Sequence, residues 1–198
     1  MANFLRIALW NANGIIKHKE ELQIFVQDQL IDIMLISETH LTDKSYLKIP
    51  GYKIYHTDYP DNTAHAGTAI LVKSTINHHQ LHKYEKDYLQ AISIRVKTLP
   101  YAKTVSAIYC PRRHHNVKKE AFLDFLQTLG PTFIAGGDFN SKHTFWGSKL
   151  ATTKGRELAK AIHEKNYSPL STGTSTYWPT NPGNVPDLLD FFITGGIS

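Results

Sequence analysis

The sequence is short of cysteine and of long hydrophobic runs. Cys110 is the one cysteine among 198 residues, which excludes an internal disulfide and any cysteine-based zinc site, and suits a reducing compartment. No apolar run approaches the roughly 20 residues needed to cross a bilayer, so we expect no membrane association. A strand-like pattern begins almost at once, which argues against a signal peptide. Without repeats or an interdomain linker, the chain is expected to form one domain over residues 1–198, as a monomer.

The composition is that of an ordinary globular chain with an excess of basic residues. Hydrophobic residues make up 41% and charged residues 20%, and the length is sufficient to bury a real core. The formal net charge of +5 and the pI near 9.2 favour polyanionic partners such as nucleic acid. A solvated basic surface gives the same charge, however, and the 11 histidines add to it only below neutral pH.

Hydrophobic periodicity predicts an α/β fold of two packed mixed β-sheets flanked by helices, because adjacent antiparallel strands alternate with helix-connected ones. Residues 104–109 should pair with residues 91–96 across a turn at 99–101, residues 58–66 should form a polar loop, and residues 76–88 give no clear assignment. Helical spacing predicts helices at 19–30, 118–129 and 154–164. Apolar or alternating runs predict strands at 5–10, 31–36, 52–55, 67–72, 91–96, 104–109, 132–135, 175–178 and 188–193.

The most informative stretch is Thr-Phe-Ile-Ala-Gly-Gly-Asp-Phe-Asn-Ser-Lys-His at 132–143. If 132–135 is a buried strand, Gly136 and Gly137 allow a tight turn at its end, and Asp138 and Asn140 then project above the sheet. Strand ends that feed loops are where open α/β sheets place their chemistry. Taken alone, the same residues also suit a plain turn followed by a helix cap.

Polar side chains recur directly after other apolar runs, at Asn11, Glu38, Tyr109, and at Asp187 with Asp190. Magnesium takes hard oxygen ligands, usually one or two carboxylates, together with water and substrate phosphate. Phosphodiester cleavage needs an attacking water, charge relief on the phosphate oxygens and help for the leaving oxygen. Carboxylates and amides at several strand ends of one sheet can supply all three, although spacing alone does not show that they converge.

Five short motifs follow one another in order: Leu-Trp-Asn-Ala-Asn-Gly at 9–14, Ile-Ser-Glu-Thr-His at 36–40, Ile-Tyr-Cys-Pro at 108–111, Gly-Gly-Asp-Phe-Asn-Ser-Lys-His at 136–143 and Leu-Asp-Phe-Phe at 189–192. Together they resemble the successive motifs of the exonuclease–endonuclease–phosphatase superfamily. The Ser-Glu-Thr-His and Asp-Phe-Asn-Ser-Lys-His-Thr-Phe-Trp-Gly segments are most similar to the endonuclease domain of insect non-LTR retrotransposons of the jockey type. The resemblance covers nearly the whole chain.

The resemblance implies a four-layered α/β sandwich that nicks genomic DNA with Mg²⁺, for which Mn²⁺ is the alternative. The nick would expose a 3′-hydroxyl for target-primed reverse transcription. The implied partners are double-stranded target DNA and a downstream reverse transcriptase of the same polyprotein. The implied site of action is the nucleus, after synthesis in the cytoplasm.

The resemblance also assigns roles. Glu38 would be the main magnesium ligand with Asn11 beside it, and Tyr109 would donate a hydrogen bond to the scissile phosphate or to metal-bound water. Asp138 would position or deprotonate the attacking water. Asn140 would orient Asp138 and bind phosphate.

Residues that contact DNA are expected around this set, in a basic loop after Tyr109 and at positions where the family approaches DNA. The same basic loop is also compatible with an ordinary solvated surface, and we expect Phe145 and Trp146 to anchor the core or a loop rather than stack on bases. The candidate DNA-binding residues are Arg112, Arg113, Lys142, His143, Thr176 and Trp178.

The chain departs from the family pattern after Asp190, which would orient a histidine. The family closes with a Ser-Asp-His motif on a further strand, and this sequence stops at Ser198 without it. We therefore expect a C-terminally truncated piece of a longer chain that nicks DNA poorly, because acid–base groups typically contribute about 10²–10⁴-fold. The missing strand should leave an open sheet edge.

Two alternatives to an endonuclease remain at this point. A related phosphoesterase would act on abasic DNA, RNA tails or lipid head groups with the same metal constellation. A catalytically impaired DNA-binding module would keep the fold and the phosphate contacts, with an affinity that falls steeply with salt. Cleavage by a longer chain distinguishes the module from the enzyme.

Overall fold

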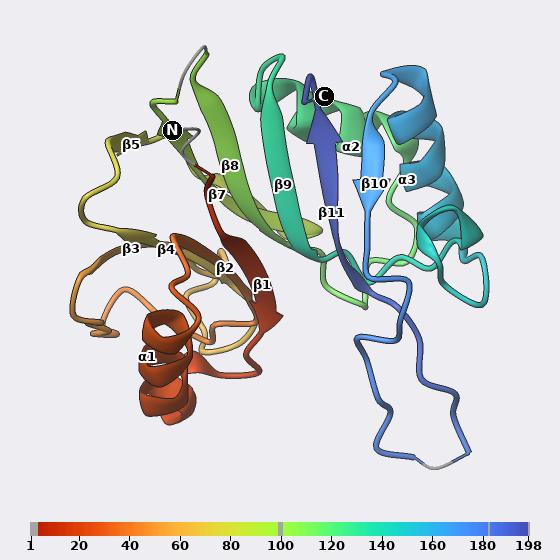
Figure 1. Ribbon diagram of the computed structural model, residues 1–198. Coiled ribbons are helices and arrows are strands. Elements are labelled where there is room, and N and C mark those ends of the chain that lie inside the picture. The colour runs from red at the N-terminus through yellow and green to blue at the C-terminus, as the bar shows by residue number, and fades with distance from the viewer. Residues whose placement is uncertain (1–3, 99–100, 182, 198) are drawn as a thin grey trace.

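The structure is a computed structural model that describes residues 4–98, 101–181 and 183–197. Its strands form two sheets that pack face to face (Figure 1). The smaller sheet has the order β1-β2-β4-β3, with β1 and β2 parallel and the other neighbours antiparallel. Its strands are β1 (Ile7–Asn11), β2 (Ile33–Ser37), β3 (Tyr52–Thr57) and β4 (Thr68–Lys73).

The larger sheet has the order β10-β11-β9-β8-β7-β5, and β6 also pairs with β7. Only β8 and β9 run parallel, joined by a helical crossover, and the other neighbours are antiparallel. The predicted pairing of residues 91–96 with 104–109 is confirmed. The strands are β5 (His78–Gln80), β6 (Tyr84–Lys86), β7 (Leu89–Val96), β8 (Lys103–Tyr109), β9 (Phe133–Asp138), β10 (Ser168–Leu170) and β11 (Asp190–Gly195).

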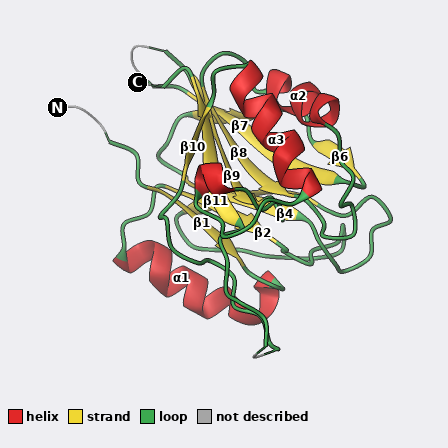
Figure 2. Ribbon diagram, turned by 90° about the vertical axis from the view of Figure 1, so that its right-hand side faces the viewer, coloured by secondary structure: helices red, strands yellow, loops and turns green. Residues whose placement is uncertain are grey.

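Helices cover the outer face of each sheet, which gives four layers (Figure 2). Helix α1 (Lys19–Asp28) packs on the smaller sheet, while α2 (Lys119–Thr128) and α3 (Thr153–Glu164) pack on the larger one. Short 3₁₀ turns occur at Ile15–His18 and Thr144–Trp146. The predicted four-layered α/β sandwich and its three helices are confirmed.

The core follows from this layering. Residues such as Leu35, Ile70, Ile92 and Val105 fill the space between the sheets, and their alternating neighbours face the helices. Every residue of β2 is buried, because both faces of a central strand are covered. No helix in the described residues is long and apolar enough to span a membrane.

The two glycines of the central stretch lie inside a strand and do not form the tight turn that we expected. β9 continues through them to Asp138 because both neighbouring strands pair with it along this length. A Cβ on Gly137 would lie 2.0 Å from the carbonyl oxygen of Ile108, and one on Gly136 would lie 2.5 Å from the Phe192 ring. The glycines therefore allow close approach of neighbouring strands and side chains.

Residues 175–178 are not a strand, and the structure has only a single bridge there, between Tyr177 and Asp187. The backbone N–H groups of Leu189 and Asp190 bond to the Thr176 hydroxyl, each at 3.0 Å, in place of a ladder. Strands β5, β6 and β10 are short. β5 and β6 lie within residues 76–88, which the hydrophobic pattern leaves unassigned, and the pattern does not predict β10. Part of the predicted turn at 99–101 lies outside the described residues.

Candidate active site

The strand ends at the lower edge of both sheets in Figure 1 bring the predicted catalytic residues together. Asn11, Tyr109 and Asp138 are the last residues of β1, β8 and β9, and Asp190 is the first residue of β11. The Asn11 amide nitrogen donates to Asp138 Oδ2 at 2.9 Å, and Asp190 is the register partner of Asp138. Residues that are far apart in the sequence thus form one polar cluster.

Asp138 lies at the centre of the cluster and is only 1% exposed. The backbone N–H of Asn140, a residue in left-handed conformation at φ 45°, donates to its Oδ1 at 2.8 Å. Burial raises the pKa of Asp138 well above its ordinary value, and the charges of Asp190 and Glu38 raise it further, against the opposing Asn140 N–H and Arg112. A carboxylate with raised proton affinity is suited to accept a proton.

Glu38 directly follows β2 and has φ 51°. A left-handed backbone at a residue other than glycine costs of order 1 kcal/mol and tends to persist where function needs it. The Glu38 side chain is half-buried, and its charge raises the pKa of Tyr109, Asp138 and Asp190. Glu38 therefore lies close to the other acidic groups of the cluster.

Tyr109 is buried at the same strand ends. Burial, then the charge of Glu38, then that of Asp138, raise the pKa of its hydroxyl above the ordinary value. The phenol consequently stays protonated at any physiological pH and acts as a hydrogen-bond donor.

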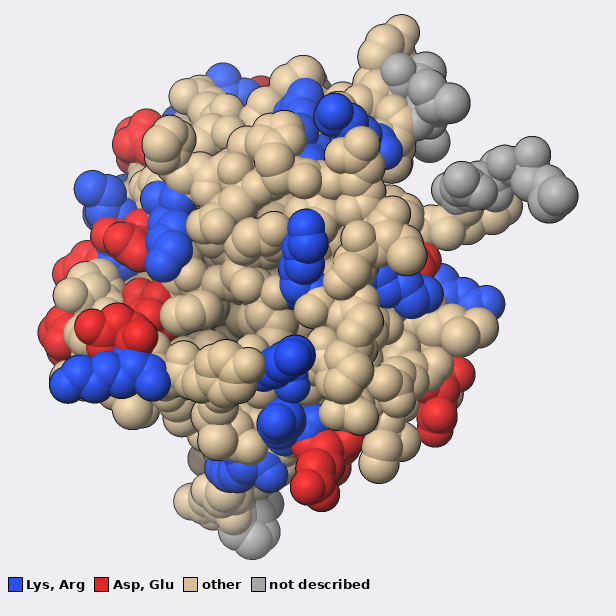
Figure 3. Space-filling model, turned by 90° about the vertical axis from the view of Figure 1, so that its left-hand side faces the viewer, with Lys and Arg blue, Asp and Glu red and all other residues tan. Residues whose placement is uncertain are grey.

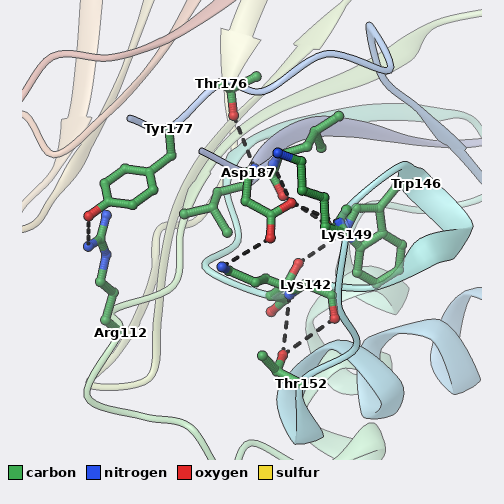
Figure 4. Close-up of polar contacts among 12 residues, drawn as sticks. Arg112, Lys142, Trp146, Lys149, Thr152, Thr176, Tyr177 and Asp187 are labelled. Carbon is green, nitrogen blue, oxygen red and sulfur yellow. Dashed lines mark hydrogen bonds and ion pairs between the residues drawn. The ribbon is translucent and has the colours of Figure 1, made fainter. Parts of the chain in front are cut away.

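Asp187 and Asp190, three residues apart, have opposite environments. Asp190 is 9% exposed, its Oδ1 has no hydrogen-bond partner in the described structure, and its pKa is raised to about 6 by burial and by Glu38, against Thr176 and Arg112. Asp187 points away from the cluster and pairs with Lys142 Nζ at 3.0 Å (Figure 4). Burial opposes the ionised form of Asp187, yet backbone N–H groups and Lys142 lower its pKa overall. Of these two residues, Asp190 therefore belongs to the candidate site, whereas Asp187 stabilises the loops beside it.

The basic loop after Tyr109 is fixed by aromatic contacts on two sides. Arg112 donates from Nε to Asn140 Oδ1 at 2.9 Å and from Nη1 to the Tyr177 hydroxyl at 3.1 Å, with its guanidinium 4.3 Å from the Tyr177 ring centre (Figure 4). Arg113 lies 4.8 Å from the ring centre of Tyr59. Arg112 therefore belongs to the cluster through Asn140, whereas Arg113 reaches across to the loop before β4.

The remaining predicted DNA-binding residues lie on the two connections beside the cluster. Trp178 is 67% exposed on the long connection between β10 and β11, which extends below the sheets in Figure 1, and Thr176 anchors that connection. His143 accepts a hydrogen bond from the Phe145 N–H at 3.1 Å, so its Nδ1 is already engaged. Lys142 is paired with Asp187.

Phe145 and Trp146 have separate roles. Trp146 is 2% exposed and donates from Nε1 to the Ser141 carbonyl at 3.0 Å, so it anchors the loop that follows Asn140, as predicted. Phe145 is 41% exposed and stacks on His163 of α3 with ring centres 4.5 Å apart.

Four residues near the cluster were missed by the sequence analysis. Ser37 accepts a hydrogen bond from the Asp138 N–H, Tyr177 holds Arg112, and Lys154 and Arg156 lie at the start of α3. Only the last two leave a sequence signal. Cations are unfavourable at a helix N-terminus, and α3 has no acidic residue in its first turn, whereas α1 has Glu20 and Glu21 there.

The residues of the cluster fit a magnesium ion, although they do not form a complete set of protein ligands for it. Within the described residues, no group of three or more His, Cys, Asp and Glu side chains is arranged to hold a metal. Magnesium needs only one or two protein carboxylates and takes its remaining ligands from water and phosphate. Glu38 and Asn11 supply oxygen donors, and the buried Asp190 Oδ1 has no partner of its own. This donor set is hard and incomplete, which suits a metal that takes its remaining ligands from water and phosphate.

The face of the molecule that lies on the left in Figure 1 carries charges of both signs (Figure 3). On the face in Figure 3, Lys and Arg occur as separate groups and Asp and Glu gather towards its margins.

Comparison with known proteins agrees with this fold. Residues 8–197 match the model of the Endonuclease/Exonuclease/phosphatase family, and the chain belongs to that family. It is 37% identical over 192 residues to the RNA-directed DNA polymerase from mobile element jockey of Drosophila melanogaster, covering 97% of this chain and 21% of that protein. It is 32% identical to the probable RNA-directed DNA polymerase from transposon BS of the same species, over 98% of this chain and 22% of that protein.

The chain thus spans about a fifth of the length of these relatives. Among solved structures, it resembles the endonuclease domain of TRAS1, a telomere-specific non-LTR retrotransposon, with a TM-score of 0.77 and 20% identity, over 98% of this chain and 86% of that one. It also resembles the Xenopus laevis APE2 catalytic domain, with a TM-score of 0.70 and 17% identity, over 96% of this chain and 82% of that one. At these identities the structural matches establish the fold, in agreement with the resemblance inferred from the motifs.

Proposed function

We propose that this chain is a divalent-metal-dependent DNA endonuclease whose nick exposes a 3′-hydroxyl for target-primed reverse transcription by a downstream reverse transcriptase. The observation that carries the proposal is the meeting of Asn11, Asp138 and Asp190 at the strand ends, with Glu38 and Tyr109 close by. The similarity to jockey-type polymerases supports the retrotransposon setting, and nuclear action follows from genomic DNA as substrate.

Glu38 and Asn11 would hold Mg²⁺ or Mn²⁺. When bound, the metal would relieve negative charge on the phosphate oxygens. Asp138 positions the attacking water and takes its proton, helped by the high proton affinity that burial gives it. Its Oδ2 is held by Asn11 and its Oδ1 by the Asn140 N–H, so the carboxylate is fixed before substrate binds.

Donors to the phosphate surround this base. Tyr109 offers a hydroxyl that stays protonated. The Asn140 amide nitrogen is buried and has no hydrogen-bond partner in the described residues, and its oxygen is held by Arg112. These fixed dipoles favour the charge that develops during cleavage, because they need no reorganisation.

Nicking of supercoiled plasmid in Mg²⁺ tests the proposal. The 198-residue chain, a longer chain that continues into the Ser-Asp-His motif, and the Asp138→Asn form of each would be compared, with Asp61→Asn as an exposed carboxylate control. We expect nicking by the longer chain, weaker nicking by the short one, and loss only with Asp138→Asn. If the longer chain binds DNA and leaves it supercoiled, the protein is a DNA-binding module and the proposal fails.

A further inference from the structure

A cavity of about 540 Å³ lies beside the catalytic cluster, between the loop after Asn140, the start of α3 and Tyr177. Among the described residues, no Asp or Glu lines it. Its walls do contain four cationic side chains, Arg112, Lys142, Lys154 and Arg156. A cavity lined by one sign of charge concentrates counter-ions, here anions.

Most of these cations have no ion-pair partner among the described residues. In the described structure Lys142 is paired with Asp187 at 3.0 Å (Figure 4), and no carboxylate lies within ion-pair distance of Arg112, Lys154 or Arg156. Lys154 is the most telling, because it is only 2% exposed and its sole acceptor is the Pro111 carbonyl at 3.2 Å. A buried ammonium without an ion-pair partner is costly, and burial accordingly lowers the pKa of Lys154, against the opposing effects of Cys110 and Asp138.

The backbone holds these cations against the site. Thr152 caps α3 by accepting from the Gly155 N–H at 3.1 Å, and its own N–H donates to the Lys142 carbonyl at 2.9 Å. A Cβ on Gly155 would lie 1.9 Å from the Lys142 carbonyl oxygen, so only glycine allows the first turn of α3 to pack this closely on the loop. The helix N-terminus, which carries partial positive charge, is thereby directed at the cavity.

The cavity is continuous with the proposed active site through Asn140. That residue lines the cavity, bonds Asp138 through its backbone, and has a buried amide nitrogen without a partner in the described residues. An anion in the cavity would therefore lie next to the reacting phosphate and within the same polyanion.

We propose that this cavity is a second phosphate-binding subsite, which holds a backbone phosphodiester of the DNA that flanks the scissile bond, with Lys154, Arg156 and the N-terminal turn of α3 as its donors. The inference rests on the proposed function for the identity of the polymer. The subsite fixes the register of the strand on the protein and reads no base, as backbone contacts do.

The experiment measures duplex-DNA binding in EDTA by fluorescence anisotropy. The salt concentration is varied from roughly 50 to 200 mM, a range over which phosphate contacts change the affinity strongly. The wild-type chain is compared with Lys154→Met and Arg156→Gln. Lys160→Gln serves as the matched control, since Lys160 is exposed on the same helix, is paired with Glu157 and does not line the cavity. Thermal unfolding confirms that each variant is folded, and Arg156, being exposed, provides the test if Lys154→Met does not fold.

Each lost phosphate contact should reduce the slope of log K against log salt by about 0.9, which is roughly eightfold in affinity at 0.1 M salt. We expect this loss in Lys154→Met and Arg156→Gln, equally on unrelated duplex sequences, and none in Lys160→Gln. An unchanged slope in folded Arg156→Gln overturns the subsite. So does an equal loss in Lys160→Gln, which would indicate a general charge effect.

One outcome distinguishes a free phosphate ion from a DNA phosphate as the ligand of the cavity. A second outcome distinguishes failure of the subsite proposal from failure of the endonuclease proposal. If inorganic phosphate stabilises the wild-type chain and not Arg156→Gln, while the salt slopes agree, the cavity binds a free anion and the DNA assignment is wrong. If the slopes differ as expected and plasmid is never nicked, the subsite stands and the endonuclease proposal fails.

Discussion

The hydroxyl of Ser37, at the end of β2, accepts a hydrogen bond from the backbone N–H of Asp138, at the end of β9, over 3.0 Å. The same hydroxyl donates to the Ile108 carbonyl of β8 at 2.7 Å. One side chain of the smaller sheet thus holds two strands of the larger sheet, directly beneath the candidate base. The two sheets are locked together where the chemistry is proposed to occur.

Ser37→Ala is expected to destabilise the protein by about 1–3 kcal/mol, because the buried Asp138 N–H and Ile108 carbonyl lose their partner. It should also lower the nicking rate, since Asp138 is no longer held from the other sheet. Urea unfolding and plasmid nicking measure the two effects. Ser93→Ala, which removes the buried Ser93–Ser106 hydrogen bond, should cost stability and leave nicking unchanged. Equal loss of activity in both variants would contradict the coupling.

Gly137→Ala is expected to cost more than about 3 kcal/mol or to prevent folding, since its Cβ would overlap a backbone oxygen that cannot move without breaking the β8–β9 ladder. Gly173→Ala is the matched control. Gly173 has φ +72° and nothing within 4 Å of its Cβ position, so it should lose only about 1 kcal/mol from the left-handed backbone. The free energies of unfolding of the two variants test this expectation. Similar losses in both variants would show that the close approach of Gly137 to the Ile108 carbonyl does not limit stability.

Asp190→Asn is expected to stabilise the metal-free protein above pH 6. The pKa of Asp190 is raised from 3.8 to about 6 in the folded state, so the ionised form disfavours folding. The free-energy cost of ionising Asp190 in the folded protein is absent below the pKa that this carboxyl has in the unfolded chain. It grows as the pH rises from about 4 to 6, and then stays constant at up to about 3 kcal/mol. Urea unfolding in EDTA at pH 4, 5, 6 and 7.5, chosen as rough steps across this window, should show the variant's advantage growing and then levelling off. An advantage that does not depend on pH would mean that the Asp190 carboxyl is not perturbed.

Arg112→Lys should slow nicking at least about tenfold, although it keeps the charge, because a lysine cannot donate to Asn140 and Tyr177 at once in the fork geometry of arginine. Arg113→Lys serves as its control, since Arg113 contacts Tyr59 and not the cluster. Nicking rates at saturating DNA separate the two. Equal rates would indicate that Arg112 contributes only charge.

The sequence predicted those parts of the fold and site that leave a local signature. The three helices and most strands follow from apolar periodicity, and the strand-end residues Asn11, Glu38, Tyr109, Asp138 and Asp190 follow from their places in ordered motifs. Their convergence could not be derived from spacing, since it depends on how β1, β9 and β11 are arranged across two sheets. The motif resemblance supplied that arrangement, and the fold agrees with it.

The elements that were missed depend on tertiary contacts. Ser37 is an ordinary strand residue until β8 and β9 are placed above it, and Lys154 is an ordinary helical lysine until α3 packs on the loop after Asn140. The error at residues 175–178 has the same origin. Thr176 and Tyr177 have strand-forming side chains, yet Thr176 bonds the neighbouring chain through its hydroxyl, and no ladder forms.

Because Asp187 and Asp190 have opposite environments, their carboxyl groups take up protons in different pH ranges. As the medium is acidified from neutrality, the Asp190 carboxyl takes up its proton near pH 6, while Asp187, whose pKa is lowered, keeps its charge and its bond to Lys142. Mild acid is therefore expected to neutralise the Asp190 carboxyl while the surrounding loops keep their shape, and returning to neutral pH would restore its charge without refolding.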